Sequence, residues 1–213
     1  MRLLALTAAV VTILMNSAHA QRPSKQYSIE DFINSESVMG ASISPDGTKV
    51  LVTSDRTGIL NAYALPVDGG PAVPLTTSKT ESIVARSYFP NDERFIYEAD
   101  QGGNELTHVY VRELDRSAKD LTPGDKLKAS FVQWADDLKS FFVVTNERDP
   151  RYFDLYEVTL DGYTRTLVYE NKNGRDVEAI SPDKRYLALG QANTRKDSDV
   201  FLLDRETGEQ NEL

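Results

Sequence analysis

The sequence predicts an all-β protein, a β-propeller of four consecutive four-stranded antiparallel blades, because three independent landmarks recur at a nearly constant step. The first is a tight turn after an apolar segment, which begins at Ser44, Phe89, Trp134 and Ser181. The second is a polar-x-aromatic triplet, which ends at Tyr63, Tyr110, Tyr156 and Phe201. The third is a closing leucine: Leu75, Leu121, Leu167 and Leu213. Successive members of each set lie 45 to 47 residues apart.

Each unit contains four short segments with strand character, as the second unit shows. Residues 83–89 lead into a Pro-Asn-Asp turn, and 94–99 form a β-rich run. Residues 107–112 alternate polar and apolar side chains, as a half-buried strand does. A turn at 115–118 precedes the closing segment 119–121. The second-unit pattern therefore predicts one antiparallel sheet per repeat.

The blades are expected to occupy residues 37–213, after an N-terminal extension of residues 21–36. Within that extension, Ser28 and Asp31 are spaced as an approximate capping box, which predicts one short helix. Propellers contain about 4–8 blades, so a closed four-bladed ring is one possibility. We favour the first part of a larger seven- or eight-bladed ring, because the chain stops on a closing leucine without a strand to pair with its N-terminus.

Residues 1–20 have the pattern of a cleaved secretory signal peptide. Arg2 supplies the positive charge, residues 3–15 form the apolar core, and Ala18 and Ala20 form the small-x-small cleavage site. A membrane anchor is the alternative, but the apolar run is shorter than the ~20 residues of a spanning helix. We therefore expect cleavage after Ala20 and a periplasmic or secreted protein.

Composition excludes several classes of function. The chain has 33 acidic and 24 basic residues, a net charge of −9, so neither nucleic acid nor an anionic membrane surface is an expected partner. It has no cysteine, which excludes disulfides, thiolate zinc sites and cysteine nucleophiles. Only His19 and His108 could act as histidine ligands, and calcium-loop and phosphate-loop motifs are absent. No metal and no cofactor is therefore expected.

No catalytic constellation is complete within this sequence. The nucleophile elbow Gly-x-Ser-x-Gly does not occur. A serine triad would have to use His108, which shares its repeat position with Asn61, Asp154 and Asp199. A position that the other three units fill with asparagine or aspartate favours a structural role, such as a hydrogen bond to a neighbouring strand. We therefore assign no catalytic residue and expect the chain alone to be inactive.

The connections between second and third strands are the expected recognition segments: 55–60, 100–105, 147–152 and 192–198. They are longer and chemically more varied than the other turns, and variable polar loops on a rigid scaffold often carry function. Asp100 and Glu105 flank Gly102-Gly103-Asn104 and could hold a ligand amine; solvated loops without a ligand are the alternative. The candidate substrate-gating residues are Asp100, Asn104, Glu105, Arg148 and Asp149.

Three features together resemble the N-terminal propeller of the prolyl oligopeptidase family of serine peptidases, in its secreted bacterial acylaminoacyl-peptidase and dipeptidyl-peptidase-like branch. They are the Ser44-Pro45-Asp46-Gly47 turn, the segment Asp100-Gln101-Gly102-Gly103-Asn104-Glu105, and the triplet His108-Val109-Tyr110. The resemblance covers residues 27–213. It implies a propeller that caps a C-terminal α/β-hydrolase domain, absent from this sequence, and restricts access to short peptides. The adjacent glutamates with which some dipeptidyl peptidases bind the substrate amino terminus are absent here.

Two other classes share the predicted fold. A non-enzymatic binding propeller, like the periplasmic protein of the Tol-Pal system, also contains Ser-Pro-Asp-Gly repeats. That protein places an α/β domain before its propeller, whereas only residues 21–36 precede the first blade here. A lactonase-type propeller enzyme would gather metal ligands or histidines from several blades, which this sequence lacks.

Overall fold

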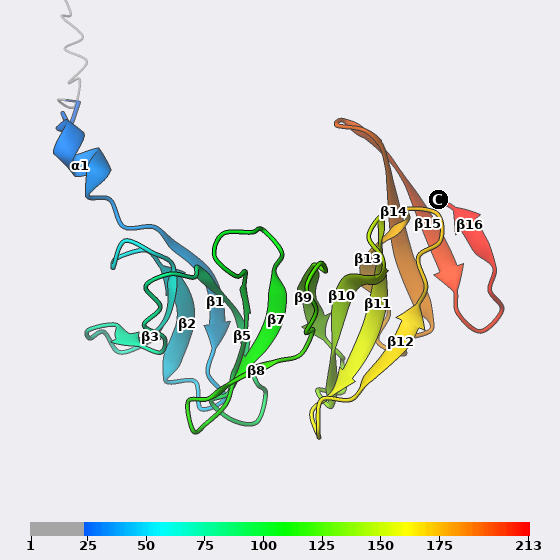
Figure 1. The fold of residues 1–213 in the computed structure, drawn as a ribbon, viewed down its shortest axis with the longest axis horizontal. Coiled ribbons are helices and arrows are strands. Elements are labelled where there is room, and N and C mark those ends of the chain that lie inside the picture. The colour runs from blue at the N-terminus through cyan, green and yellow to red at the C-terminus, as the bar shows by residue number, and fades with distance from the viewer. Residues whose placement is uncertain (1–23) are drawn as a thin grey trace, which may run out of the picture. The chain divides into compact units, whose positions relative to one another are not determined.

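The computed structural model describes residues 24–213 (Figure 1). The predicted signal peptide, with Ala18 and Ala20, lies outside the described residues. The chain divides after Ser35 into two units, which we describe separately. None of the helices in the described part of the chain is long and apolar enough to cross a membrane.

The N-terminal unit contains the short helix α1 (Ile29–Ile33). Ser28 caps it: its Oγ accepts a hydrogen bond from the Asp31 backbone N–H at 3.2 Å. The Asp31 carboxylate in turn accepts one from the Ser28 backbone N–H at 2.8 Å. This reciprocal pair is the capping box that the sequence predicts, and it satisfies backbone donors that a helix start leaves free.

Residues 36–213 contain four antiparallel four-stranded sheets, each made from one continuous segment, as predicted. We call them blades 1 to 4, in chain order from blue to red in Figure 1. Blade 1 comprises β1 (Val38–Ile43), β2 (Lys49–Ser54), β3 (Asn61–Pro66) and β4 (Val73–Pro74). Blade 2 comprises β5 (Ile83–Tyr88), β6 (Phe95–Ala99), β7 (His108–Arg112) and β8 (Ala118–Asp120). Blade 3 comprises β9 (Ala129–Trp134), β10 (Ser140–Asp149), β11 (Tyr152–Thr159) and β12 (Arg165–Tyr169). Blade 4 comprises β13 (Asp176–Ile180), β14 (Tyr186–Thr194), β15 (Asp197–Asp204) and β16 (Gln210–Glu212).

The turn between the first and second strands is closed by the same backbone hydrogen bond in every blade. A backbone N–H at the start of each turn donates to the carbonyl five residues later, at 2.8 to 2.9 Å: Ser44 to Lys49, Phe89 to Arg94, Ala135 to Ser140, and Ser181 to Tyr186. An aspartate in each turn also accepts the N–H two residues ahead: Asp46, Asp92, Asp137 and Asp183. These repeated bonds explain why the turn landmarks keep phase along the sequence, although the third turn begins at Ala135, one residue after the predicted Trp134.

The closing leucines follow a related rule with one exception. Leu75, Leu121 and Leu213 come directly after the outer strand, and each donates its N–H to a carbonyl of the third strand, at 2.8 to 2.9 Å. Leu167 instead lies inside β12, opposite Tyr156, because that strand continues for two more residues.

The hydrophobic core consists of three clusters, and each is shared by two consecutive blades. The cluster between blades 2 and 3 is the most aromatic, with Phe89 and Phe141 fully buried and Trp134 packed against both. Leu51 and Phe95 belong to the cluster between blades 1 and 2. Phe142 and Leu187 belong to the one between blades 3 and 4. Neighbour packing therefore supplies the core, as in other repeat architectures.

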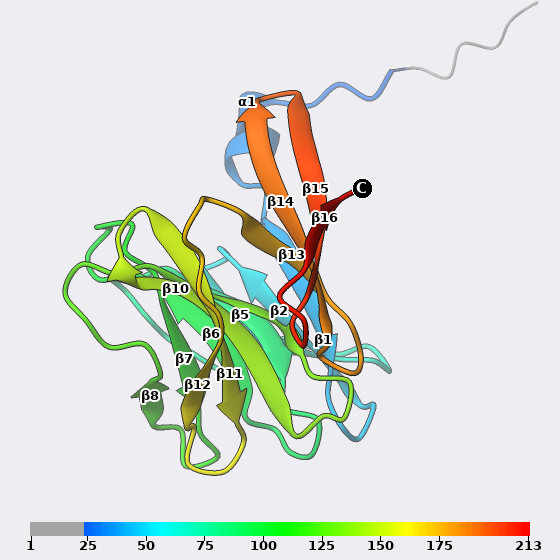
Figure 2. The same cartoon turned by 90° about the vertical axis from the view of Figure 1, so that its right-hand side faces the viewer.

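The structure corrects the expected form of two connections. Residues 147–152 and 192–198 are not long loops, because β10 runs to Asp149 and β14 runs to Thr194. Each pair of strands continues as a hairpin that only two residues connect. Figure 2 shows the β14–β15 hairpin extending beyond β13 and β16. Cross-strand pairing between residues such as Ala192 and Ser198 holds these polar segments in extended form.

Candidate functional site

A pocket of about 650 Å³ lies where blades 2 and 3 meet. Its walls come from the first strands β5 and β9, from the end of β6, from the β6–β7 loop and from Phe153 at the start of β11. The charged side chains that line it are Arg86, Glu98, Asp100, Glu105 and Lys128. Within residues 24–213 no group of three or more acidic or histidine side chains is arranged to hold a metal ion.

The β6–β7 loop, residues 100–107, is shaped by its own polar side chains. The Asp100 carboxylate accepts the Glu105 backbone N–H at 3.0 Å. The Asn104 side-chain oxygen accepts the Leu106 N–H at 2.9 Å. Glu81, which is not part of the loop, also holds it in place, because its carboxylate accepts the Gly102 N–H at 2.6 Å. Two of the predicted gating residues therefore set the loop conformation.

Glu105 has an uncommon backbone conformation. Its φ is +61°, in the left-handed region that favours glycine, and its side chain lines the pocket. The bond from its N–H to Asp100 stabilises this conformation at the end of the Gly102-Gly103 turn. Strained residues of this kind cluster at ligand sites, so Glu105 stays a candidate for ligand contact.

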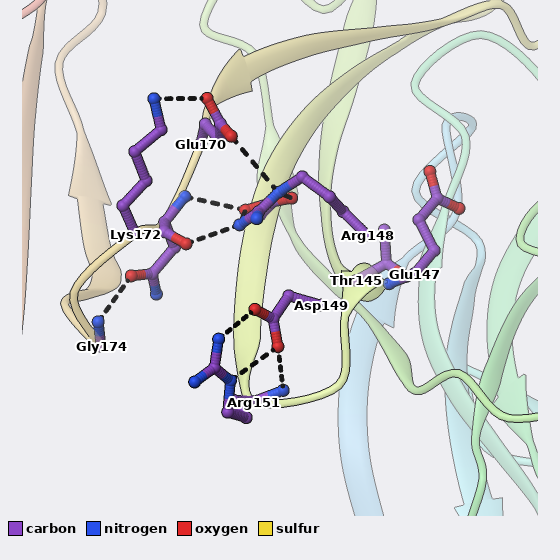
Figure 3. Close-up of polar contacts among 10 residues, drawn as sticks. Thr145, Glu147, Arg148, Asp149, Arg151, Glu170, Lys172 and Gly174 are labelled. Carbon is purple, nitrogen blue, oxygen red and sulfur yellow. Dashed lines mark hydrogen bonds and ion pairs between the residues drawn. The ribbon is translucent and has the colours of Figure 1, made fainter.

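Arg148 and Asp149 form a separate polar cluster at the β10–β11 hairpin (Figure 3). The Arg148 guanidinium makes two bonds to the carboxylate of Asp154, at 2.6 and 2.8 Å, and a third to the Asn171 carbonyl at 2.6 Å. The bonds to the Asp154 carboxylate raise the pKa of Arg148 above its usual range. Asp149 pairs with Arg151, whose two bonds lower the pKa of Asp149.

The direction of the Arg148 side chain is set by Asp154, which lies on the other strand of the same hairpin. The Asp154 side chain is 0% exposed, and it also accepts the Asn171 backbone N–H at 2.8 Å. A buried carboxylate is stable only when charged or polar partners surround it. Arg148 thus ties the hairpin to the segment that leads from blade 3 to blade 4. Neither Arg148 nor Asp149 is among the residues that line the pocket.

His108 has the structural environment that its repeat position predicts. It is buried, and its Nδ1 lies 2.8 Å from the Asp120 carboxylate at the end of β8. Asn61 and Asp154, at the same repeat position, likewise bond to the segment after the fourth strand, through Ser78 and Asn171. In blades 1 to 3 the polar residue of the triplet therefore anchors the exit from its blade, whereas Asp199 of blade 4 accepts a hydrogen bond from the Asn193 side chain.

Sequence reasoning missed Arg86, Glu98 and Lys128. Glu98 is 3% exposed, and its carboxylate accepts the Phe131 N–H of blade 3 at 2.8 Å. Thr53 occupies the same place in blade 1 and accepts the Ala85 N–H of blade 2 at 2.8 Å. The repeat could have pointed to Glu98, because aligning the turns of blades 1 and 2 places Glu98 at the position of Thr53.

Comparisons with known proteins support the class of fold and then the family. TolB from Acinetobacter baumannii aligns with a TM-score of 0.59 at 18% identity, over 84% of this chain and 43% of its own. A puromycin-hydrolysing peptidase of Mycobacterium tuberculosis aligns with a TM-score of 0.58 at 20% identity, over 84% and 31%. At these identities the likeness establishes the fold alone, a β-propeller.

The family follows from sequence. Residues 75–213 match the prolyl oligopeptidase N-terminal β-propeller domain. Dipeptidyl aminopeptidase BIII of Pseudoxanthomonas mexicana is 30% identical over 167 residues, which are 76% of this chain and 24% of that protein. The chain belongs to the prolyl oligopeptidase propeller family, which confirms the resemblance. It spans about a quarter of the length of this curated relative.

Proposed function

We propose that this chain is the propeller of a serine peptidase of the prolyl oligopeptidase family, and that it admits and positions short peptides for an α/β-hydrolase domain. The family match over residues 75–213 is the observation that carries the proposal. The dipeptidyl aminopeptidase relative supports peptides as the substrate class. The proposal includes a larger ring of seven or eight blades and a catalytic serine contributed by that hydrolase domain.

The pocket between blades 2 and 3 is the proposed contact with peptide. Asp100 and Glu105 supply carboxylates that can accept hydrogen bonds from a peptide amine or backbone N–H. Asn104 keeps the loop in the conformation that presents them, through its bond to Leu106. Arg148 acts on substrate indirectly in this proposal, since its side chain holds the hairpin that carries Phe153 into the pocket, and Asp149 pairs with Arg151 at the connection of the same hairpin.

The test uses the natural protein that contains this propeller. We expect a serine-directed fluorophosphonate probe to label it, and we expect it to hydrolyse a short chromogenic peptide. Glu105→Gln should raise KM several-fold with little change in kcat, because the residue lies in the propeller rather than at the reacting bond. Glu113→Gln, a glutamate outside the pocket, is the matched control and should change neither constant.

The opposite outcome supports the alternative, a non-enzymatic periplasmic binding propeller, for which the TolB likeness supports only the fold. A protein that the probe does not label, and that hydrolyses no peptide, would contradict the peptidase proposal. Hydrolysis by the present chain alone that His108→Ala abolishes would contradict the assignment of His108 as structural.

Export is part of the same proposal. The periplasmic or secreted protein should begin at Gln21, after removal of residues 1–20. N-terminal sequencing of protein from the periplasm or medium tests this directly. A mature protein that retains Arg2 and its apolar segment would contradict it.

A further inference from the structure

A β-bulge recurs at one position in the first strand of every blade. The pairing of each first strand with the second shifts between Met39 and Ser42, Ala85 and Ser87, Phe131 and Gln133, and Val177 and Ala179. The extra residue is Arg86 in blade 2, whereas blade 3 has Val132 and blade 4 has Glu178. A bulge turns its extra side chain away from the regular ladder. In blade 2 it brings an arginine to the pocket wall.

The buried carboxylate of Glu98 holds Arg86 in place. One Glu98 oxygen accepts from the Arg86 guanidinium, and the other accepts from the Phe131 N–H of blade 3. Glu98 therefore makes hydrogen bonds to both blades at this boundary, and it fixes one nitrogen of the Arg86 guanidinium. The Arg86 side chain remains 43% exposed while its partner is 4% exposed.

The rest of the guanidinium is available to a ligand. Arginine has five N–H donors in a planar fork that matches a carboxylate. Within residues 24–213, Glu98 is the hydrogen-bond partner found for the Arg86 side chain. Lys128 lines the same pocket, and its position is set through its backbone, which exchanges bonds with Asn146 at 2.6 and 3.1 Å.

Charge is distributed unevenly around the pocket. Asp100 and Glu105 come from the β6–β7 loop, whereas Arg86 and Lys128 come from β5 and from the residue before β9. Glu98 balances one positive charge, since it is paired with Arg86. A ligand that carries both an ammonium and a carboxylate group therefore finds partners of opposite sign in one pocket.

We propose that Arg86 and Lys128 bind a carboxylate of the peptide that enters this pocket. The proposal rests on the proposed function, and it adds a substrate class: peptides with a free C-terminal carboxylate or an acidic side chain. Both groups present the same two oxygens to the guanidinium fork. Glu98 is the positioning residue in this scheme, because it orients Arg86 without contacting the ligand.

Titration calorimetry on the natural protein tests the proposal with four probes: Ala-Ala acid, Ala-Ala amide, Ala-Glu amide and acetyl-Ala-Ala acid. We expect Ala-Ala amide to bind about tenfold more weakly than Ala-Ala acid, as the loss of a charge-assisted bond implies. Tight binding of Ala-Glu amide would assign the site to an acidic side chain. Weak binding of this probe would assign it to the C-terminus.

Variants then identify the residues. Arg86→Gln and Lys128→Gln should each weaken the binding of Ala-Ala acid several-fold and leave the affinity for Ala-Ala amide unchanged. Lys128→Gln does not disturb Glu98, so it keeps the test decisive if Arg86→Gln lowers stability. Arg86→Lys keeps the positive charge but loses the planar guanidinium, so this variant should retain only part of the affinity for Ala-Ala acid. Arg185→Gln is the matched control: Arg185 also pairs with a carboxylate, that of Asp204, but does not line the pocket.

The outcomes separate this inference from the proposed function. If the fluorophosphonate probe labels the protein but Ala-Ala acid, Ala-Ala amide and Ala-Glu amide bind equally to the unchanged protein, the carboxylate subsite is wrong and the peptidase proposal stands. Equal loss of acid and amide affinity in both variants would also overturn the subsite. A protein that is not labelled and binds none of the four peptides overturns both.

Discussion

The indole Nε1 of Trp134 donates a hydrogen bond to the hydroxyl oxygen of Ser87 at 2.8 Å, across the boundary between blades 3 and 2. The next boundary has a similar bond, because the Tyr88 N–H of blade 2 donates to Ser42 of blade 1 at 3.0 Å. These bonds lie beside apolar clusters and join first strands that are about one repeat apart in the sequence. Directional bonds of this kind fix the rotation of one blade against the next.

Trp134→Phe should lower the free energy of unfolding by about 1 kcal/mol through loss of that hydrogen bond, in addition to a packing term. Urea melts of the single variants Trp134→Phe and Ser87→Ala, and of the double variant, isolate the bond from the packing. We expect a coupling energy of about 1 kcal/mol. Strictly additive effects would show that the bond does not contribute to stability.

Asp154→Ala should destabilise the protein by roughly 3 kcal/mol, because it leaves the Arg148 guanidinium and the buried Asn171 N–H without their acceptor. Asp149→Ala is the matched control, since it removes a carboxylate whose partner Arg151 is largely exposed. Exposed pairs contribute little, so its melting curve should stay close to that of the unchanged protein. Similar losses in both variants would refute the distinction between the two aspartates.

Asp46 should contribute to the acid sensitivity of folding. Hydrogen bonds from the Ser44 hydroxyl, and then from the Thr48 N–H and hydroxyl, lower the pKa of Asp46 from 3.8 to about 2. A carboxyl whose pKa is lower when folded stabilises the protein above pH 3.8 and loses that contribution as pH falls to about 2. In the Asp46→Asn variant, the free energy of unfolding should therefore depend less on pH between 3.8 and about 2. Chemical denaturation at a series of acidic pH values measures this dependence. The same loss of stability with falling pH in the variant and in the unchanged protein would contradict the prediction.

Tyr163 should act in the opposite pH range. Burial, and then the 2.8 Å hydrogen bond that it donates to Glu113, raises the pKa of Tyr163 from 10.0 to about 12. A raised phenol pKa means that stability is full below pH 10 and falls as pH approaches 12. Tyr163→Phe should be less stable near neutral pH, and its stability should fall less between pH 10 and 12. Ultraviolet titration of the folded protein should lose one late-titrating phenol in this variant.

Much of the blade architecture was predictable because it is encoded locally. A turn such as Ser44-Pro45-Asp46-Gly47 depends on the φ of proline, on positive φ at Gly47 and on a side-chain bond two residues away. Alternation in 107–112 likewise follows from the strand period. Leu167 departed from the pattern because the length of β12 depends on pairing with β11, rather than on its own residues.

The candidate site was predictable only in part. Asp100 and Glu105 were found because glycines and carboxylates together mark a functional loop, and both line the pocket. Arg148 was expected to face substrate, but the buried Asp154, six residues away, engages its guanidinium. The sequence showed both residues, and nothing in it showed that β10 and β11 continue as a hairpin that brings them together.

By itself, then, the sequence determined the repeat, the four sheets, their turns and the family, because these depend on neighbouring residues and on spacing that four copies reinforce. Only the tertiary structure decided which charged groups meet. Arg86, Glu98 and Lys128 converge because a bulge turns one side chain from its ladder and because Glu98 reaches the Phe131 N–H of the next blade. Such contacts depend on how one blade packs against the next, and sequence periodicity contains no information about that packing angle.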